Sequence, residues 1–184
     1  MWPWPAQMGF RPGGYYYPGW VDAVWGWLIR RRYRREPWYT EESVVNVNAE
    51  RIVPELQRLR AGDRIQDGPD GYFEVRAVLP ERALVLYSAR HPLSGRPVDP
   101  GDPRTGAFVE CSWVFVLEGI AAETTRLRVR LRADYTPGPA AAAAVSLLVE
   151  PGDWLLQHLM LAGLKARAER PRPATPAADP APTG

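Results

Sequence analysis

Residues 126–132 read RLRVRLR, and they alternate without interruption between arginine and an aliphatic residue. Successive side chains of a β-strand point to opposite faces of its sheet. Leu127, Val129 and Leu131 therefore share one face, and the four arginines share the other. This pattern predicts a strand with one buried face and one wet face, as in an antiparallel sheet covered on one side.

Three further segments extend this sheet towards the N-terminus. Alternating or continuous apolar residues predict strands in YFEVRAVL (72–79), RALVLYSA (82–89) and AFVECSWVFVLEGI (107–120). Pro80 and Glu81 make a tight turn between the first two, and a Pro/Gly-rich loop at 91–106 precedes the third. Short connections of this kind favour an antiparallel meander of about five strands.

Helices are expected on either side of the sheet in the chain. Val21, Val24, Trp25 and Leu28 have helical spacing, and the charged residues 30–45 then indicate a surface loop or a frayed helix end. Near the C-terminus a long helix follows the alanine run 140–144, and Pro151 with Gly152 should break, kink or restart it. The sequence thus predicts an α+β fold.

The C-terminal helix supplies the expected cover for the sheet. Its predicted sheet-facing residues are Trp154, Leu155, His158 and Leu159. Residues 171–184 hold no aromatic or large aliphatic side chain and are expected to be a disordered tail after one domain at 1–170.

Composition narrows the function classes. A formal net charge of +2 over 184 residues argues against a dedicated nucleic-acid binder. Cys111 is the only cysteine and the two histidines lack metal-ligand spacing, so neither a metal nor a cofactor is expected. No run of 18 apolar residues or signal peptide is present, which makes stable membrane insertion unexpected and a cytoplasmic location the default.

Several strings, in order, resemble the SRPBCC superfamily, the helix-grip fold of START domains and aromatic polyketide cyclases, and more narrowly a bacterial SRPBCC group of unassigned function. They are WPWPAQMG (2–9), GYYY (14–17), AERIVPELQRLRAGD (49–63), FEVRAV (73–78), ALVL (83–86), SWVFVLE (112–118), TRLRVRLR (125–132) and LAGLKARAE (161–169). The resemblance implies a curved antiparallel sheet wrapped around a long C-terminal helix, with a cavity between them that holds lipids, polyketides or similar molecules.

The resemblance begins in the middle of a family element, at Met1-Trp2-Pro3-Trp4. The family's first strand, which pairs with its last one, is therefore expected to be missing, and Pro5 should weaken the helix that follows. A misread start codon with an upstream segment left out and a genuine truncation both remain open. A bare sheet edge would allow either a monomer or an edge-paired homodimer.

A cavity between sheet and helix would be lined by apolar residues from both. The expected lining is Phe73, Val75, Leu84, Leu86, Trp113, Phe115, Leu127, Val129, Trp154, Leu155, His158 and Leu159. A register shift of one residue in 110–118 would replace Trp113 and Phe115 by Val114 and Val116. The same residues would also suit a plain packed core without a ligand.

Three functions follow from these expectations. The first is binding or carriage of an apolar small molecule in this cavity. The second is a cyclase- or dehydratase-like enzyme, for which His158, Tyr87 and Cys111 are the only polar candidates. The third is a membrane- or protein-interaction module that uses the Trp-rich segment and the basic run Arg30–Arg35, although a solvated loop is the favoured interpretation of that run. The scarcity of catalytic groups favours the binder.

Overall fold

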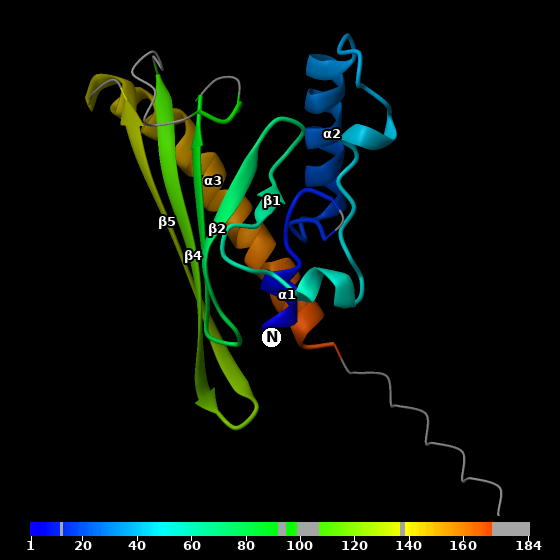
Figure 1. The fold of residues 1–184 in the computed structure, drawn as a ribbon, viewed down its shortest axis with the longest axis vertical. Helices are drawn as coiled ribbons and strands as arrows, with labels where there is room; N and C mark the ends of the chain where they lie inside the picture. Colours follow the sequence, from blue (N-terminus) through cyan, green and yellow to red (C-terminus); the bar gives the residue numbers. More distant parts are fainter. Residues whose placement is uncertain (12, 92–94, 99–106, 137–138, 171–184) are drawn as a thin grey trace, which may run out of the picture.

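A five-stranded antiparallel sheet dominates the computed structural model, which describes residues 1–11, 13–91, 95–98, 107–136 and 139–170. The strands follow one another in chain order as a meander, which confirms the predicted α+β class and strand arrangement (Figure 1). The strands are β1 (Arg64–Gln66), β2 (Tyr72–Leu79), β3 (Ala83–Arg90), β4 (Phe108–Ala121) and β5 (Thr124–Thr136). The expected tail at 171–184 lies outside the described residues.

Alternation along the central strands defines a buried inner face. Leu84 of β3 pairs with Phe115 of β4, Leu86 pairs with Trp113, and all four side chains are buried. Val114 on the opposite face is only half-buried. The register chosen for 110–118 is therefore confirmed.

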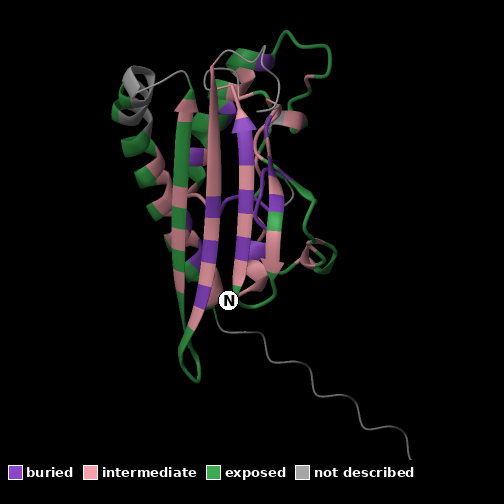
Figure 2. Ribbon diagram, turned by 60° about the vertical axis from the view of Figure 1, so that its left-hand side comes forward, coloured by how far each residue is buried: buried purple, intermediate pink, exposed green. Residues whose placement is uncertain are grey.

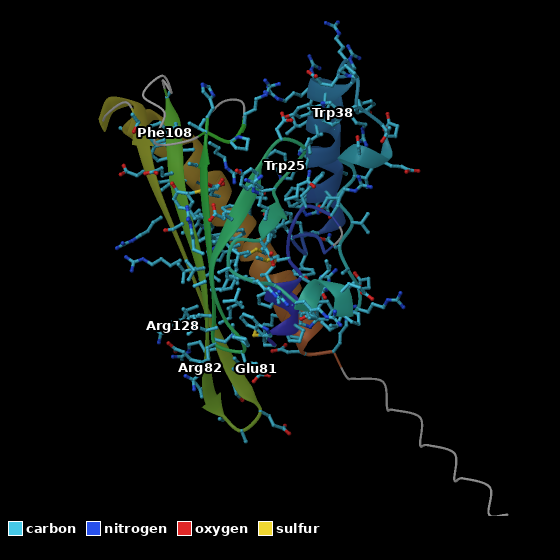
Figure 3. The ribbon with its side chains drawn as sticks, viewed as in Figure 1. Trp25, Trp38, Glu81, Arg82, Phe108 and Arg128 are labelled. Atoms are coloured by element: carbon cyan, nitrogen blue, oxygen red, sulfur yellow. The ribbon has the colours of Figure 1, made fainter. Side chains whose placement is uncertain are left out.

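The outermost strand β5 is less protected than its sequence suggests. Leu127, Val129 and Leu131 face inwards, but each is only half-buried, while the alternating arginines are exposed (Figure 2). Within the described residues β5 pairs with β4 alone, so one of its sides lacks a neighbouring strand. Arg128 lies on the outer face, where its Nε donates to Glu118 at 3.0 Å (Figure 3).

Helical segments lie on the inner side of the sheet (Figure 1). The basic residues Arg30–Arg32 form the last turn of the second helix, which agrees with the helix-end alternative and not with a loop. Pro151 lies inside one continuous C-terminal helix, so the predicted break or restart there is wrong. The helical segments are α1 (Pro3–Ala6), α2 (Gly19–Tyr33), η1 (Glu42–Val44), η2 (Pro54–Gln57) and α3 (Pro139–Ala168).

The helix α3 packs on the core through a different face from the one predicted. Met160 and Leu164 are fully buried against the sheet residues and Tyr16. Gly163 lies on the packed side, because a Cβ atom there would come within 2.0 Å of the Tyr16 carbonyl oxygen. This close approach of the Tyr16 backbone fixes the rotation of α3 about its axis.

The prediction that Trp154, Leu155, His158 and Leu159 face the sheet is therefore wrong. Trp154 is 62% exposed and Leu155 46% exposed, His158 is exposed, and Leu159 is half-buried. Leucines occupy a wide arc of α3, so the apolar pattern does not single out one stripe. The sheet-facing stripe runs instead through Leu156, Met160 and Leu164.

Candidate ligand cavity

A cavity of about 590 Å³ lies between α2, the inner face of the sheet and the middle of α3. Its volume is in the range of small-molecule sites. Trp25 extends from α2 towards the sheet and forms part of one wall (Figure 3). Much of the cavity lining consists of aromatic and aliphatic side chains: Tyr15, Tyr17, Trp25, Leu28, Phe73, Trp113, Leu131 and Tyr135.

The predicted lining and the observed lining overlap only in part. Phe73 and Trp113 border the cavity. The other predicted sheet residues lie in the core or pack against it: Val75, Leu84, Leu86, Phe115, Leu127 and Val129. From α3 the cavity receives Asp153, Leu156 and Gln157, not the four residues predicted.

An ion pair with a tyrosine marks the polar side of the cavity. Asp67, in the turn after β1, accepts a hydrogen bond from the Tyr15 hydroxyl at 2.7 Å and forms an ion pair with Arg90 of β3. The Arg90 Nε donates to Ser88 Oγ at 2.9 Å, and its guanidinium lies 4.8 Å from the centre of the Phe73 ring. The charge and donors of Arg90 are thus already engaged by the protein.

These contacts control the protonation of the cluster. Burial, reinforced by the Asp67 carboxylate, holds the pKa of Tyr15 well above its ordinary value. Burial alone would lower the pKa of Arg90, but Asp67 raises it overall. Tyr15 therefore stays a neutral donor, and Arg90 stays charged.

Asp153 of α3 contributes a second carboxylate to the cavity. It is half-buried, and it makes no hydrogen bond or ion pair with any described residue. Burial raises the pKa of Asp153, and repulsion from Asp67 raises it further, more than the attraction of Arg90 lowers it. The cavity thus contains an acid that the described part of the chain leaves without a partner.

A network of asparagines holds the α2 wall against the rest of the domain. Asn48 Nδ2 donates to Asp22 at 2.6 Å, and Asn48 Oδ1 accepts from the Tyr16 backbone N–H at 2.6 Å. Asn46 Nδ2 also donates to Asp22. Tyr16 has a φ of 61°, a left-handed conformation that a tyrosine rarely adopts, so these bonds fix a strained turn between α1 and α2.

Two buried polar atoms at the cavity residues have no partner in the described part of the chain: Trp113 Nε1 and Asn46 Oδ1. Buried polar groups in folded proteins are nearly always hydrogen-bonded. A ligand that offers polar atoms next to these residues would supply the missing partners.

The catalytic candidates from the sequence do not converge in this cavity. Tyr87 lies on the outer face and donates to Glu110 at 2.6 Å, and exposed His158 contacts the Trp154 carbonyl oxygen through Nδ1. Cys111 does border the cavity, but burial raises the pKa of its thiol and keeps it protonated. Among the described residues no three His, Cys, Asp or Glu side chains gather in a way that suits a metal.

The polar side of the cavity was not anticipated from the sequence: Tyr15, Tyr17, Asp67, Arg90 and Asp153 were all missed. One signal was present. Leu84, Leu86, Ser88 and Arg90 alternate on β3, so Arg90 occupies an inward position that a solvated arginine would avoid. Asp67 and Asp153 carry no comparable pattern, because a turn and a helix rotation bring them together.

Comparison of the chain with protein-family models, curated proteins and solved structures gives no match. In the part of the chain that the structure describes, none of the helices combines the length and the apolar character needed to cross a bilayer.

Proposed function

We propose that this protein binds a hydrophobic small molecule in the cavity between α2, the sheet and α3. The cavity itself carries this proposal, because aromatic and aliphatic side chains from α2, β2, β4 and β5 face a space of about 590 Å³ that they do not fill. The unpartnered Trp113 Nε1 supports it, since it is a donor without an acceptor among the described residues.

The proposed fold family is the helix-grip superfamily that the sequence resembles. The five-stranded antiparallel meander and the long helix α3 are compatible with such a fold. Under this proposal the ligand lies nearer to α2 than to the helix residues first expected, because α3 approaches the sheet through Leu156 and Met160.

Filling the cavity from the sheet tests the proposal. Ala133 of β5 borders the cavity, whereas Arg132, its neighbour, points to the outer face. We expect Ala133→Trp to reduce binding of a hydrophobic fluorescent probe such as anilinonaphthalene sulfonate at least about tenfold, because the indole occupies the ligand's space. Arg132→Trp is the matched control and should bind the probe like the parent. Equal binding by both variants would refute the site.

An exposed face of α2 supports a second candidate function, docking onto an anionic membrane surface. Trp20, Val24 and Trp27 are spaced along one side of α2 and are each more than half exposed. The Arg31 guanidinium lies 5.7 Å from the Trp27 ring centre. Aromatic side chains next to several arginines are typical of proteins that bind at the surface of anionic bilayers.

Vesicle sedimentation tests this second candidate. Vesicles that contain phosphatidylserine should retain the protein, whereas pure phosphatidylcholine vesicles should not, and Trp20→Ser with Trp27→Ser should abolish the difference. Equal sedimentation with both vesicle types would count against electrostatic docking.

A further inference from the structure

We propose that the ligand of the cavity is a hydrophobic amine, with its ammonium group beside Asp153 and its apolar body between the aromatic walls. This inference rests on the proposed function and specifies the chemical class that the same site takes. It is drawn from the charges that face the cavity and from the rings that surround it.

The charged groups that face the cavity leave a negative excess in its interior. Asp22, Asp67 and Asp153 come from three different segments, against Arg90 inside and the exposed Arg32 on α2. Arg90 is engaged by Asp67 and Ser88. Among the described residues none forms an ion pair with Asp153, and Arg90, which attracts its carboxylate, is already paired with Asp67.

The raised pKa of Asp153 agrees with an excess of negative charge in the cavity. Its pKa is raised because burial and the Asp67 carboxylate disfavour a second negative charge, and Glu150, one turn earlier on α3, adds to the effect. A bound ammonium group would reverse the balance, because an opposite charge within a few ångströms favours the ionised carboxylate.

The walls suit a cation with an apolar body. Tyr15, Tyr17, Trp25, Trp113 and Tyr135 border the space, and aromatic faces attract ammonium groups as well as alkyl and aryl chains. Asn46 Oδ1 is a buried acceptor without a donor among the described residues, and an ammonium N–H would provide one. The unpartnered Trp113 Nε1 is itself a donor, so an ammonium group, which also only donates, does not pair with it, and the charge preference rests on the carboxylates, Asn46 and the rings.

Three probes of equal carbon number separate charge from apolar affinity: 4-phenylbutylamine, 4-phenylbutanol and 4-phenylbutyrate. Their affinities for the full chain can be measured at neutral pH by isothermal titration calorimetry. We expect the amine to bind about tenfold more tightly than the alcohol, the size of a partly screened charge contact, and the carboxylate to bind most weakly.

Two variants assign the preference to Asp153. Asp153→Asn should reduce the amine-over-alcohol ratio from about tenfold to near one, because it removes the charge and keeps the size of the side chain. Glu123→Gln removes a charge from the exposed turn between β4 and β5, outside the cavity lining, and should keep the ratio of the parent. Circular dichroism of both variants establishes that they are folded before the ratios are compared.

Each result separates this inference from the function on which it rests. If the alcohol binds but the amine binds no better, or if Asp153→Asn keeps the amine preference, the amine assignment is overturned and a neutral hydrophobic ligand remains. If none of the three probes binds the folded protein, the proposed binding function itself fails.

Discussion

The same face of the same sheet is filled at one end and hollow at the other. Along β4 the inward residues Phe115 and Leu117 are buried in the filled end, whereas Val109, Cys111 and Trp113 border the cavity. Strand alternation therefore decides which side chains face inwards, but it does not decide whether anything packs against them.

The helix α3 explains the difference between the two ends. At the filled end it presents Met160 and Leu164, both fully buried, and Gly163 allows it to approach the Tyr16 backbone closely. At the hollow end it presents Asp153 and Gln157, which are too polar to fill an apolar space without partners. The change along α3 from polar residues at the cavity to apolar residues further on therefore explains why one end of the sheet is packed and the other is hollow.

The largest expected effect comes from truncating an inward ring at the filled end. Phe115→Ala should lower the free energy of unfolding by about 3–5 kcal/mol, because the fully buried ring leaves a cavity in close packing. Leu131→Ala, a smaller truncation at the hollow end, should cost only about 1 kcal/mol, since Leu131 is half-buried and already borders empty space. Urea denaturation of both variants measures the two values, and equal losses would mean that the hollow end is packed in solution.

A smaller effect is expected where α3 meets the Tyr16 backbone. Gly163→Ala should destabilise the protein by about 2 kcal/mol, because its Cβ would lie within 2.0 Å of the Tyr16 carbonyl oxygen and force the two segments apart. Gly152, at the hollow end of the same helix, has no atom within 4 Å of the position that a Cβ would take there. Gly152→Ala should therefore stabilise the protein by about 0.5–1 kcal/mol through helix propensity. Thermal unfolding of the Gly163→Ala and Gly152→Ala variants measures the two effects. Equal effects of the two substitutions would mean that α3 is rotated differently about its axis.

The strands could be predicted well because their pattern is local. YFEVRAVL at 72–79 coincides with β2, and the inward set Trp113 and Phe115 follows from period-2 alternation beside paired strands. The half-burial of Leu127 and Val129 could not be predicted from that pattern, because it depends on how much of β5 other segments cover.

The candidate site was harder to predict because distant segments build it. Tyr15 lies before α2, Asp67 follows β1 and Arg90 ends β3, so only the tertiary fold brings these three residues into contact. The rotation of α3 was mispredicted because apolar residues surround much of that helix, although Gly163 held the relevant signal: a glycine inside a helix costs stability unless a close contact requires it. Placing Gly163 instead of Trp154 on the packed side of α3 predicts the face that the structure shows.

The smallest effect concerns the charge at the hollow end. Asp153→Asn should raise the free energy of unfolding at pH 7, because the folded parent holds a half-buried carboxylate whose pKa is raised by burial and by Asp67. A raised pKa means that the folded state binds this proton more tightly than the unfolded state. The parent is therefore relatively most stable below the unfolded value of about 3.9 and loses that stability as the pH rises through the folded pKa.

The gain from Asp153→Asn should accordingly shrink as the pH falls and vanish below about pH 3.9, where the carboxyl group is protonated in both states. Urea midpoints of the parent and the variant, measured in parallel from pH 7 to pH 3, follow this difference. Glu123→Gln is the control, since it removes an exposed carboxylate from the turn between β4 and β5, outside the cavity lining. If Asp153→Asn is instead less stable than the parent at pH 7, the carboxylate makes a favourable contact within the protein, and Asp153 is not an unpartnered acid at the hollow end.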